Sequence, residues 1–139
     1  QDVNGTVRAI FHDAAAYVGN DIVAGPGVDV VGPIESVDLP ADWFDVVVST
    51  EVLEHHRHPY EVVRVAYRVL KRGGVVILTA AGPGRPPHGA NGGRRPEPGE
   101  WYHNIDPLGL EGWLRLAGFD DVEIDVLGSD VRATAVKGW

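Results

Sequence analysis

Cysteine is absent from the 139-residue sequence, and so is methionine, even at position 1. The lack of cysteine excludes disulfide scaffolds, thiolate metal ligands and thiol nucleophiles. No apolar run approaches the length of about 18 residues that a membrane-spanning helix needs, and no signal peptide is visible. We therefore expect a cytoplasmic protein that has no membrane contact.

Basic residues are also few, with 12 Lys or Arg against 20 Asp or Glu and a formal net charge of −8. This balance argues against a nucleic acid as partner, though not against a small local basic patch. Neither G-x-G-x-x-G nor G-x-x-x-x-G-K-[ST] occurs, so the dinucleotide and P-loop phosphate motifs are excluded. The length predicts one domain over residues 1–139.

Apolar runs alternate with helical patterns along the chain, which is typical of βαβ units. The pattern predicts an α/β fold with a mostly parallel sheet. The expected helices cover residues 7–14, 58–72 and 106–117, and the expected strands cover 16–22, 28–31, 44–49, 75–81, 122–127 and 131–137. Residues 44–49 should be buried on both faces because they are almost continuously apolar. Ligands of such sheets bind beyond the carboxyl ends of the strands.

Two strand ends carry polar residues that fit such a site. Asp21 closes the first expected strand, where a carboxylate can accept hydrogen bonds from ribose hydroxyls. The alternative is a turn-forming aspartate before Gly25. Ser49, Thr50 and Glu51 follow the strongest strand, and a polar loop with a capping hydroxyl is the alternative there.

Three neighbouring histidines, His55, His56 and His58, raise the question of a metal site. Adjacent loop histidines rarely point at one ion, and no carboxylate at ligand spacing completes a set. We therefore predict no metal. His55 remains a candidate acid or base, since the reference pKa of histidine is close to physiological pH.

Residues 82–100 contain 11 Gly or Pro and form a predicted loop, either a passive linker or an active-site cover. We expect a cover, with Trp101 and Tyr102 roofing the acceptor site and His88 contributing to substrate binding. His103 joins His55 as a candidate catalytic residue. Three loop arginines could hold an anionic small molecule: Arg85, Arg94 and Arg95.

The segments FDVVVSTEVLEH (44–55), VLKRGGVVIL (69–78), YVGNDI (17–22) and AGF (117–119) together resemble the class I S-adenosylmethionine-dependent methyltransferase family. The resemblance implies a three-layer Rossmann-like sheet that is mostly parallel, with an antiparallel C-terminal strand. It also implies S-adenosylmethionine as cofactor and methyl transfer to a small molecule. The implied cofactor-binding residues are Asp2, Asn4, Gly5, Asp21, Ile22, Ile34, Glu35, Ser49, Thr50 and Glu51.

The sequence departs from the family pattern in two places. Residues 1–5 (QDVNG) look like the end of the family's glycine-rich turn, and its first strand has no counterpart in the sequence. We therefore expect an N-terminally truncated domain, in which a homodimer could supply a strand. Pro33 stands near the position where the family often has an adenine-binding Asp. The alternative is therefore a non-catalytic remnant of this fold that acts as an interaction module.

Overall fold

The computed structural model describes residues 7–90, 92–93 and 95–139, which belong to two compact units, Gln1–Asp38 and Leu39–Trp139. The expected cofactor-binding residues Asp2, Asn4 and Gly5 lie outside the described residues. The single domain expected over residues 1–139 stays a prediction.

The first unit holds a short parallel strand pair, β1 (Asn20–Asp21) and β2 (Val30–Val31), preceded by the 3₁₀ helix η1 (Val7–Phe11). The side-chain amide of Asn20 donates to the carbonyls of Val30 and Gly32, at 3.0 Å each, and so ties the pair together. The α-helix expected over residues 7–14 is wrong. Its apolar stripe is not covered within this unit, where Ile10 is 74% exposed, and an uncovered stripe of this length does not sustain a helix.

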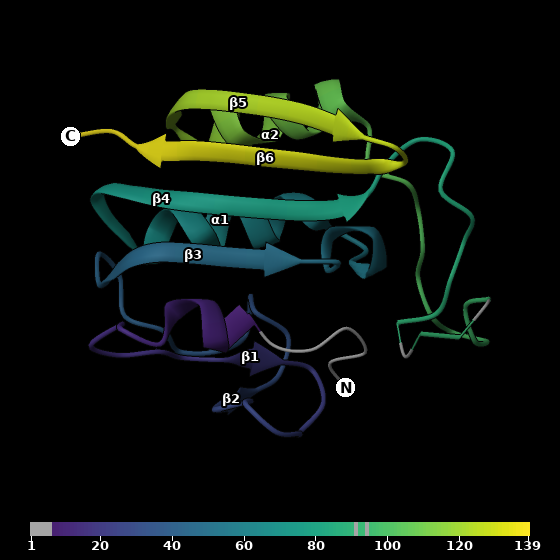
Figure 1. The fold of residues 1–139 in the computed structure, drawn as a ribbon, viewed down its shortest axis with the longest axis horizontal. Coiled ribbons are helices and arrows are strands. Elements are labelled where there is room, and N and C mark those ends of the chain that lie inside the picture. The colour runs from purple at the N-terminus through teal and green to yellow at the C-terminus, as the bar shows by residue number, and fades with distance from the viewer. Residues whose placement is uncertain (1–6, 91, 94) are drawn as a thin grey trace. The chain divides into compact units, whose positions relative to one another are not determined.

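The second unit is built on a four-stranded sheet in the order β3-β4-β6-β5 (Figure 1). The strands are β3 (Phe44–Thr50), β4 (Leu70–Ala81), β5 (Phe119–Leu127) and β6 (Asp130–Lys137). β3 pairs with β4 in parallel, whereas β6 runs antiparallel to both β4 and β5. Three strands thus share one direction and the C-terminal strand opposes them, which confirms the predicted fold class.

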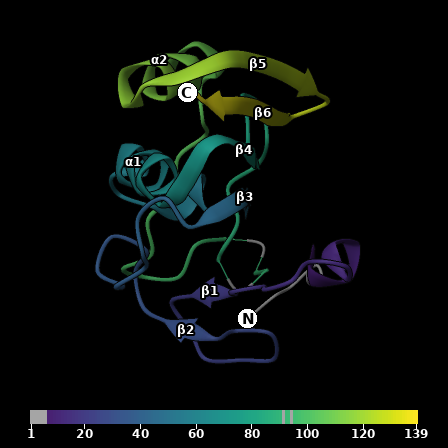
Figure 2. The same ribbon diagram turned by 90° about the vertical axis from the view of Figure 1, so that its left-hand side faces the viewer.

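Helices α1 (Pro59–Val69) and α2 (Pro107–Ala117) both lie on one face of this sheet (Figures 1 and 2). Alternate residues of β4 face the helices and are fully buried, among them Val76 and Leu78. The opposite face has no helix among the described residues of this unit, and Val46 there is 39% exposed. Burial of β3 on both faces is therefore wrong for this unit. None of the described helices is long and apolar enough to cross a membrane.

Local capping signals set the bounds of α2. Asp106 accepts a hydrogen bond from the Gly109 amide, and Gly118 ends the helix in the left-handed conformation at φ 105°. Helix α1 ends earlier than expected, at Val69, because Leu70 is already extended and pairs with Phe44 of β3. Sheet pairing here overrides the helical pattern that continues to Arg72.

A buried lysine joins the two ends of the second unit. Lys137 is 9% exposed, and its ammonium donates to Asp42 Oδ1 at 2.6 Å and to the Leu70 carbonyl at 2.8 Å. It also lies 4.7 Å from the ring centre of Tyr67. The hydrogen bond from Lys137 lowers the pKa of Asp42 below its ordinary value.

We expect Lys137→Met to destabilise the chain by about 1–3 kcal/mol, because methionine keeps the apolar stem but leaves the Leu70 carbonyl unpaired. Lys71→Met is the matched control, since Lys71 makes an exposed ion pair with Asp45 and such pairs contribute about 0–1 kcal/mol. Urea unfolding measures both variants. Equal losses in the two would contradict the role assigned to Lys137.

Candidate functional site

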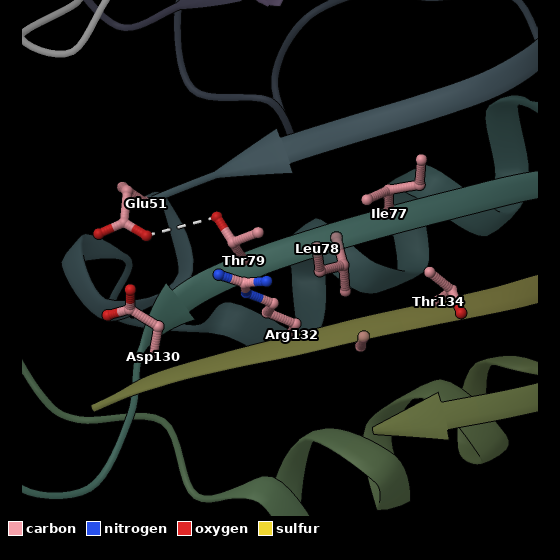
Figure 3. A pocket seen from close by; sticks show the side chains of 8 residues that line it. Glu51, Ile77, Leu78, Thr79, Asp130, Arg132 and Thr134 are labelled. Carbon is pink, nitrogen blue, oxygen red and sulfur yellow. Dashed lines mark hydrogen bonds between the residues drawn. The ribbon is translucent and has the colours of Figure 1, made fainter. Parts of the chain in front are cut away.

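The strand-end segment after β3 has an unusual backbone. Glu51 has a φ of 56°, and its amide donates to the Thr79 carbonyl at 2.9 Å. A non-glycine residue in the left-handed region is strained, and such strain often occurs at functional sites. The Thr79 hydroxyl donates to Glu51 Oε1 at 3.3 Å, which fixes the carboxylate over the edge of the sheet (Figure 3).

Arg85 anchors the start of the 82–104 loop to this edge. One guanidinium nitrogen lies 2.7 Å from Glu51 Oε2 and 2.7 Å from Asp130 Oδ1. Two carboxylates therefore already balance the charge of Arg85, and its role in holding an anion stays a prediction. Arg95 is exposed, and Arg94 lies outside the described residues.

A hollow of about 390 Å³ lies beside this ion-pair network, over the sheet face that carries no helix (Figure 3). Residues of β4 and β6, the end of β3 and the turn before β6 line it: Glu51, Ile77, Leu78, Thr79, Asp130, Arg132, Ala133 and Thr134. One end is therefore charged and the floor is apolar, which suits a small molecule with a polar group.

Glu54 follows the strongest expected strand closely, but its burial and a role for it could not be predicted from the sequence. It lies in the 3₁₀ helix η2 (Leu53–His55) and is fully buried. Its Oε1 accepts a hydrogen bond from the Ala81 amide at 3.2 Å. Burial, reinforced by the nearby negative charge of Glu51, raises the pKa of Glu54 to about 7.

Three aromatic rings meet next to Glu54. The ring centres of His55 and His88 are 5.0 Å apart, and Tyr102 lies 5.5 Å from His55 and 4.9 Å from His88. His88 Nε2 is 3.9 Å from Glu54 Oε1. Burial lowers the pKa of His55, and the neighbouring His88 lowers it further. The structure thus brings together three of the expected site residues from η2 and the loop.

Trp101 and His103 form a second pair next to this cluster, and the His103 amide donates to the Glu54 carbonyl at 2.9 Å. The Trp101 indole N–H donates to His103 Nδ1 at 2.8 Å, and Arg57 lies 5.7 Å from the Trp101 ring centre. Trp101 is 44% exposed and faces His103 rather than the ring cluster. Burial lowers the pKa of His103 as well. The role of Trp101 and Tyr102 as a roof over the acceptor site stays a prediction.

The other expected cofactor residues occupy turns and strand ends within their own units. In the second unit, Ser49 Oγ is buried and has no hydrogen-bond partner among the described residues, and Thr50 is exposed. In the first unit, Asp21 ends β1 and its Oδ1 accepts from the Val23 amide at 2.9 Å. Ile22 is exposed, whereas Ile34 and Glu35 lie in the turn after β2.

Sequence comparison finds similarity to methyltransferases. A family described as "Methyltransferase domain" matches residues 6–78. A chloroplastic 2-methyl-6-phytyl-1,4-hydroquinone methyltransferase of Oryza sativa subsp. japonica is 36% identical over 107 residues, 76% of this chain and 31% of that protein. A mitochondrial ubiquinone biosynthesis O-methyltransferase of Mus musculus is 44% identical over 45 residues, 32% of this chain and 12% of that protein. The chain thus spans less than a third of the length of these curated relatives.

Solved structures show the same fold. A Burkholderia thailandensis 1,6-didemethyltoxoflavin-N1-methyltransferase superposes with a TM-score of 0.71 and 18% identity, covering 97% of this chain and 67% of that one. A Mesorhizobium loti S-adenosylmethionine-dependent methyltransferase superposes with a TM-score of 0.69 and 17% identity. The match covers 93% of this chain and 84% of that one. At these identities the likeness shows the fold alone.

Proposed function

Since the chain belongs to the methyltransferase domain family, we propose that it binds S-adenosylmethionine and transfers the methyl group to a small-molecule acceptor. The observation that carries the proposal is the edge after β3, where a strained Glu51, the buried Glu54 and the rings of His55 and Tyr102 lie together. Polar groups concentrated at the carboxyl ends of parallel strands are the usual ligand site of such folds.

The residues present fit the cofactor. Ser49 Oγ is a buried polar atom without a partner among the described residues, so a polar group of a ligand would satisfy it. We assign Ser49, Thr50 and Glu51 to the methionine part. In the first unit we assign Asp21, with Ile22 beside it, to the ribose, and Ile34 and Glu35 to the adenine.

Methyl transfer from S-adenosylmethionine needs little acid–base catalysis by the protein. When bound, S-adenosylmethionine supplies a methyl group already activated on a sulfonium. A nucleophilic atom of the acceptor forms a bond to the methyl carbon while the carbon–sulfur bond breaks and its electron pair stays on sulfur. The chain's contribution is alignment of the acceptor, which can supply most of the rate. A hydroxyl or amine acceptor must also lose a proton.

His55 suits the role of proton acceptor better than His103. Neutral histidine has one lone pair on its ring nitrogens, and that of His103 already accepts the Trp101 indole N–H. His55 Nδ1 is buried and has no partner among the described residues. Because its pKa is lowered, His55 is neutral near physiological pH and can take a proton.

The proposal is tested by titrating the full chain with S-adenosylhomocysteine in a calorimeter and by assaying tritium transfer from labelled S-adenosylmethionine. The hydroquinone named in the rice relative suggests short-chain hydroquinones and catechols as acceptor probes. We expect saturable binding and label in the extracted probe. Absence of both would overturn the proposal.

Substitutions of His55 and His103 test which of the two histidines is the base. We expect His55→Gln to lower turnover by about 100-fold or more, and His103→Asn to change it much less, with equal S-adenosylhomocysteine affinity in both. If both variants keep full turnover from about pH 6 to 9, neither histidine is the base.

One observation favours a second candidate, the non-catalytic interaction module. Pro33, in the turn after β2, offers neither a side-chain acceptor nor an amide N–H to an adenine ring. The same calorimetric titration decides between the two: saturable heat supports the enzyme, and its absence supports the module.

A further inference from the structure

We propose that Glu54, His55 and His88 form a binding site for a divalent transition-metal ion of the Zn²⁺ type. Each residue offers one ligand atom, and these three atoms all lie within 4.8 Å of one another. The sequence predicts no metal, because His56 and His58 cannot complete a set with His55. The structure instead adds a histidine from the 82–104 loop and a carboxylate from η2.

The spacing is close to that of a ligand set. Two donors on one Zn²⁺ lie about 3.3 Å apart when the metal–nitrogen distances are about 2.0–2.1 Å. His88 Nε2 and Glu54 Oε1 are separated by 3.9 Å, and no two of the three ligand atoms are more than 4.8 Å apart, so ligation needs each pair to close by about 1.5 Å or less. His88 is carried by an irregular loop segment, which can make that adjustment without disturbing the sheet.

Two buried acceptor atoms of the cluster residues have no hydrogen-bond partner among the described residues: Glu54 Oε2 and His55 Nδ1. Glu54 itself is fully buried, with its other oxygen held by the Ala81 amide. The Ala81 amide satisfies only one oxygen of this carboxylate, and a cation would satisfy the other oxygen together with the imidazole nitrogens.

The backbone around the cluster orients the imidazoles as ligands. His88 Nδ1 lies 3.3 Å from the Pro86 carbonyl, which favours a proton on Nδ1 and leaves the lone pair of Nε2 facing Glu54. A hydrogen bond to the Trp101 backbone holds the His55 ring. Metal-binding histidines usually donate their second N–H to a carbonyl or carboxylate in this way.

The donor set selects the kind of ion. Two imidazole nitrogens and one carboxylate suit Zn²⁺ and similar first-row ions, whereas Ca²⁺ and Mg²⁺ prefer all-oxygen sets. Three protein ligands leave at least one coordination position for water or an oxygen of a bound molecule. His55 Nδ1 cannot hold a metal and accept a proton together, so the role of His55 as base applies to the chain without a bound metal ion.

The experiment titrates the full, EDTA-stripped chain with Co²⁺ and follows its visible d–d absorption, with Zn²⁺ as competitor. We expect one Co²⁺ per chain, displaced by Zn²⁺. His88→Asn and Glu54→Gln should each weaken binding by at least about 100-fold. His58→Asn is the matched control, because exposed His58 lies outside the cluster and should leave affinity unchanged.

Circular dichroism establishes that each variant is folded, and His88→Asn decides the matter if Glu54→Gln does not fold. No Co²⁺ band in the unsubstituted chain, or equal affinity in His88→Asn and His58→Asn, would overturn the site. S-adenosylhomocysteine binding is measured on the same EDTA-treated sample. Cofactor binding without Co²⁺ binding refutes the metal site alone, and Co²⁺ binding without cofactor binding refutes the proposed function alone.

Discussion

Glu54→Gln should make the metal-free chain about 3 kcal/mol more stable at pH 8, although it removes a charged group. Folding raises the pKa of Glu54 from 4.5 to about 7, chiefly through burial. Each pKa unit corresponds to about 1.4 kcal/mol, so keeping the ionised carboxylate buried costs about 3 kcal/mol. Glutamine is neutral at every pH and keeps an oxygen for the Ala81 amide.

Proton binding by Glu54 decides how the free energy of unfolding changes with pH. Between pH 4.5 and about 7 the folded chain holds the Glu54 proton while the unfolded chain has released it. Stability from this group is therefore full below pH 4.5 and is lost as the pH rises through about 7. The unsubstituted chain and Glu54→Gln should have similar stability below pH 4.5. As the pH rises, the stability of the unsubstituted chain should fall and that of the variant should not.

Urea unfolding in EDTA at several pH values measures the difference between the two chains. Glu123→Gln is the matched control, because Glu123 is exposed on β5 and should leave the pH profile unchanged. A Glu54→Gln variant that is less stable than the unsubstituted chain at every pH would show that the carboxylate is stabilised by a partner, contrary to the burial argument.

Elements with strong local signals were predictable from the sequence. The start of α2 at Pro107 and its end before Gly118 depend on residues within the helix and its caps, so the sequence contains the whole signal. The end of α1 depends on pairing between Leu70 and Phe44, which lie 26 positions apart. The helix expected near Ile10 failed because an apolar stripe predicts a helix only where another surface covers it.

The site was predictable only in part. Strand-end reasoning led to Ser49 and Glu51 because parallel strands end at one edge of a sheet. Nothing in the sequence indicated that Glu54 is fully buried, since carboxylates are rarely buried without a partner. His88 reaches Glu54 through a loop rich in Gly and Pro, which has no periodicity to predict its path.

Replacing Asp21 by Ala should weaken binding of S-adenosylhomocysteine by more than tenfold. The assignment to the ribose predicts two charge-assisted hydrogen bonds, each contributing about 1.5–3 kcal/mol, and about 1.4 kcal/mol corresponds to a factor of ten in affinity. The structure also supports a simpler role, because Asp21 Oδ1 accepts from the Val23 amide at 2.9 Å and so shapes the turn after β1. The alanine variant alone would not separate these roles.

Asp21→Asn separates them, because asparagine keeps an oxygen for the Val23 amide but loses the charge that strengthens bonds to ribose hydroxyls. Asp13→Ala is the control within the same unit, since the Asp13 side chain is 91% exposed. We expect calorimetry to show roughly tenfold or greater weakening for Asp21→Asn and none for Asp13→Ala. If Asp21→Asn binds as tightly as the unsubstituted chain while Asp21→Ala does not, Asp21 acts through the turn and the ribose assignment is wrong.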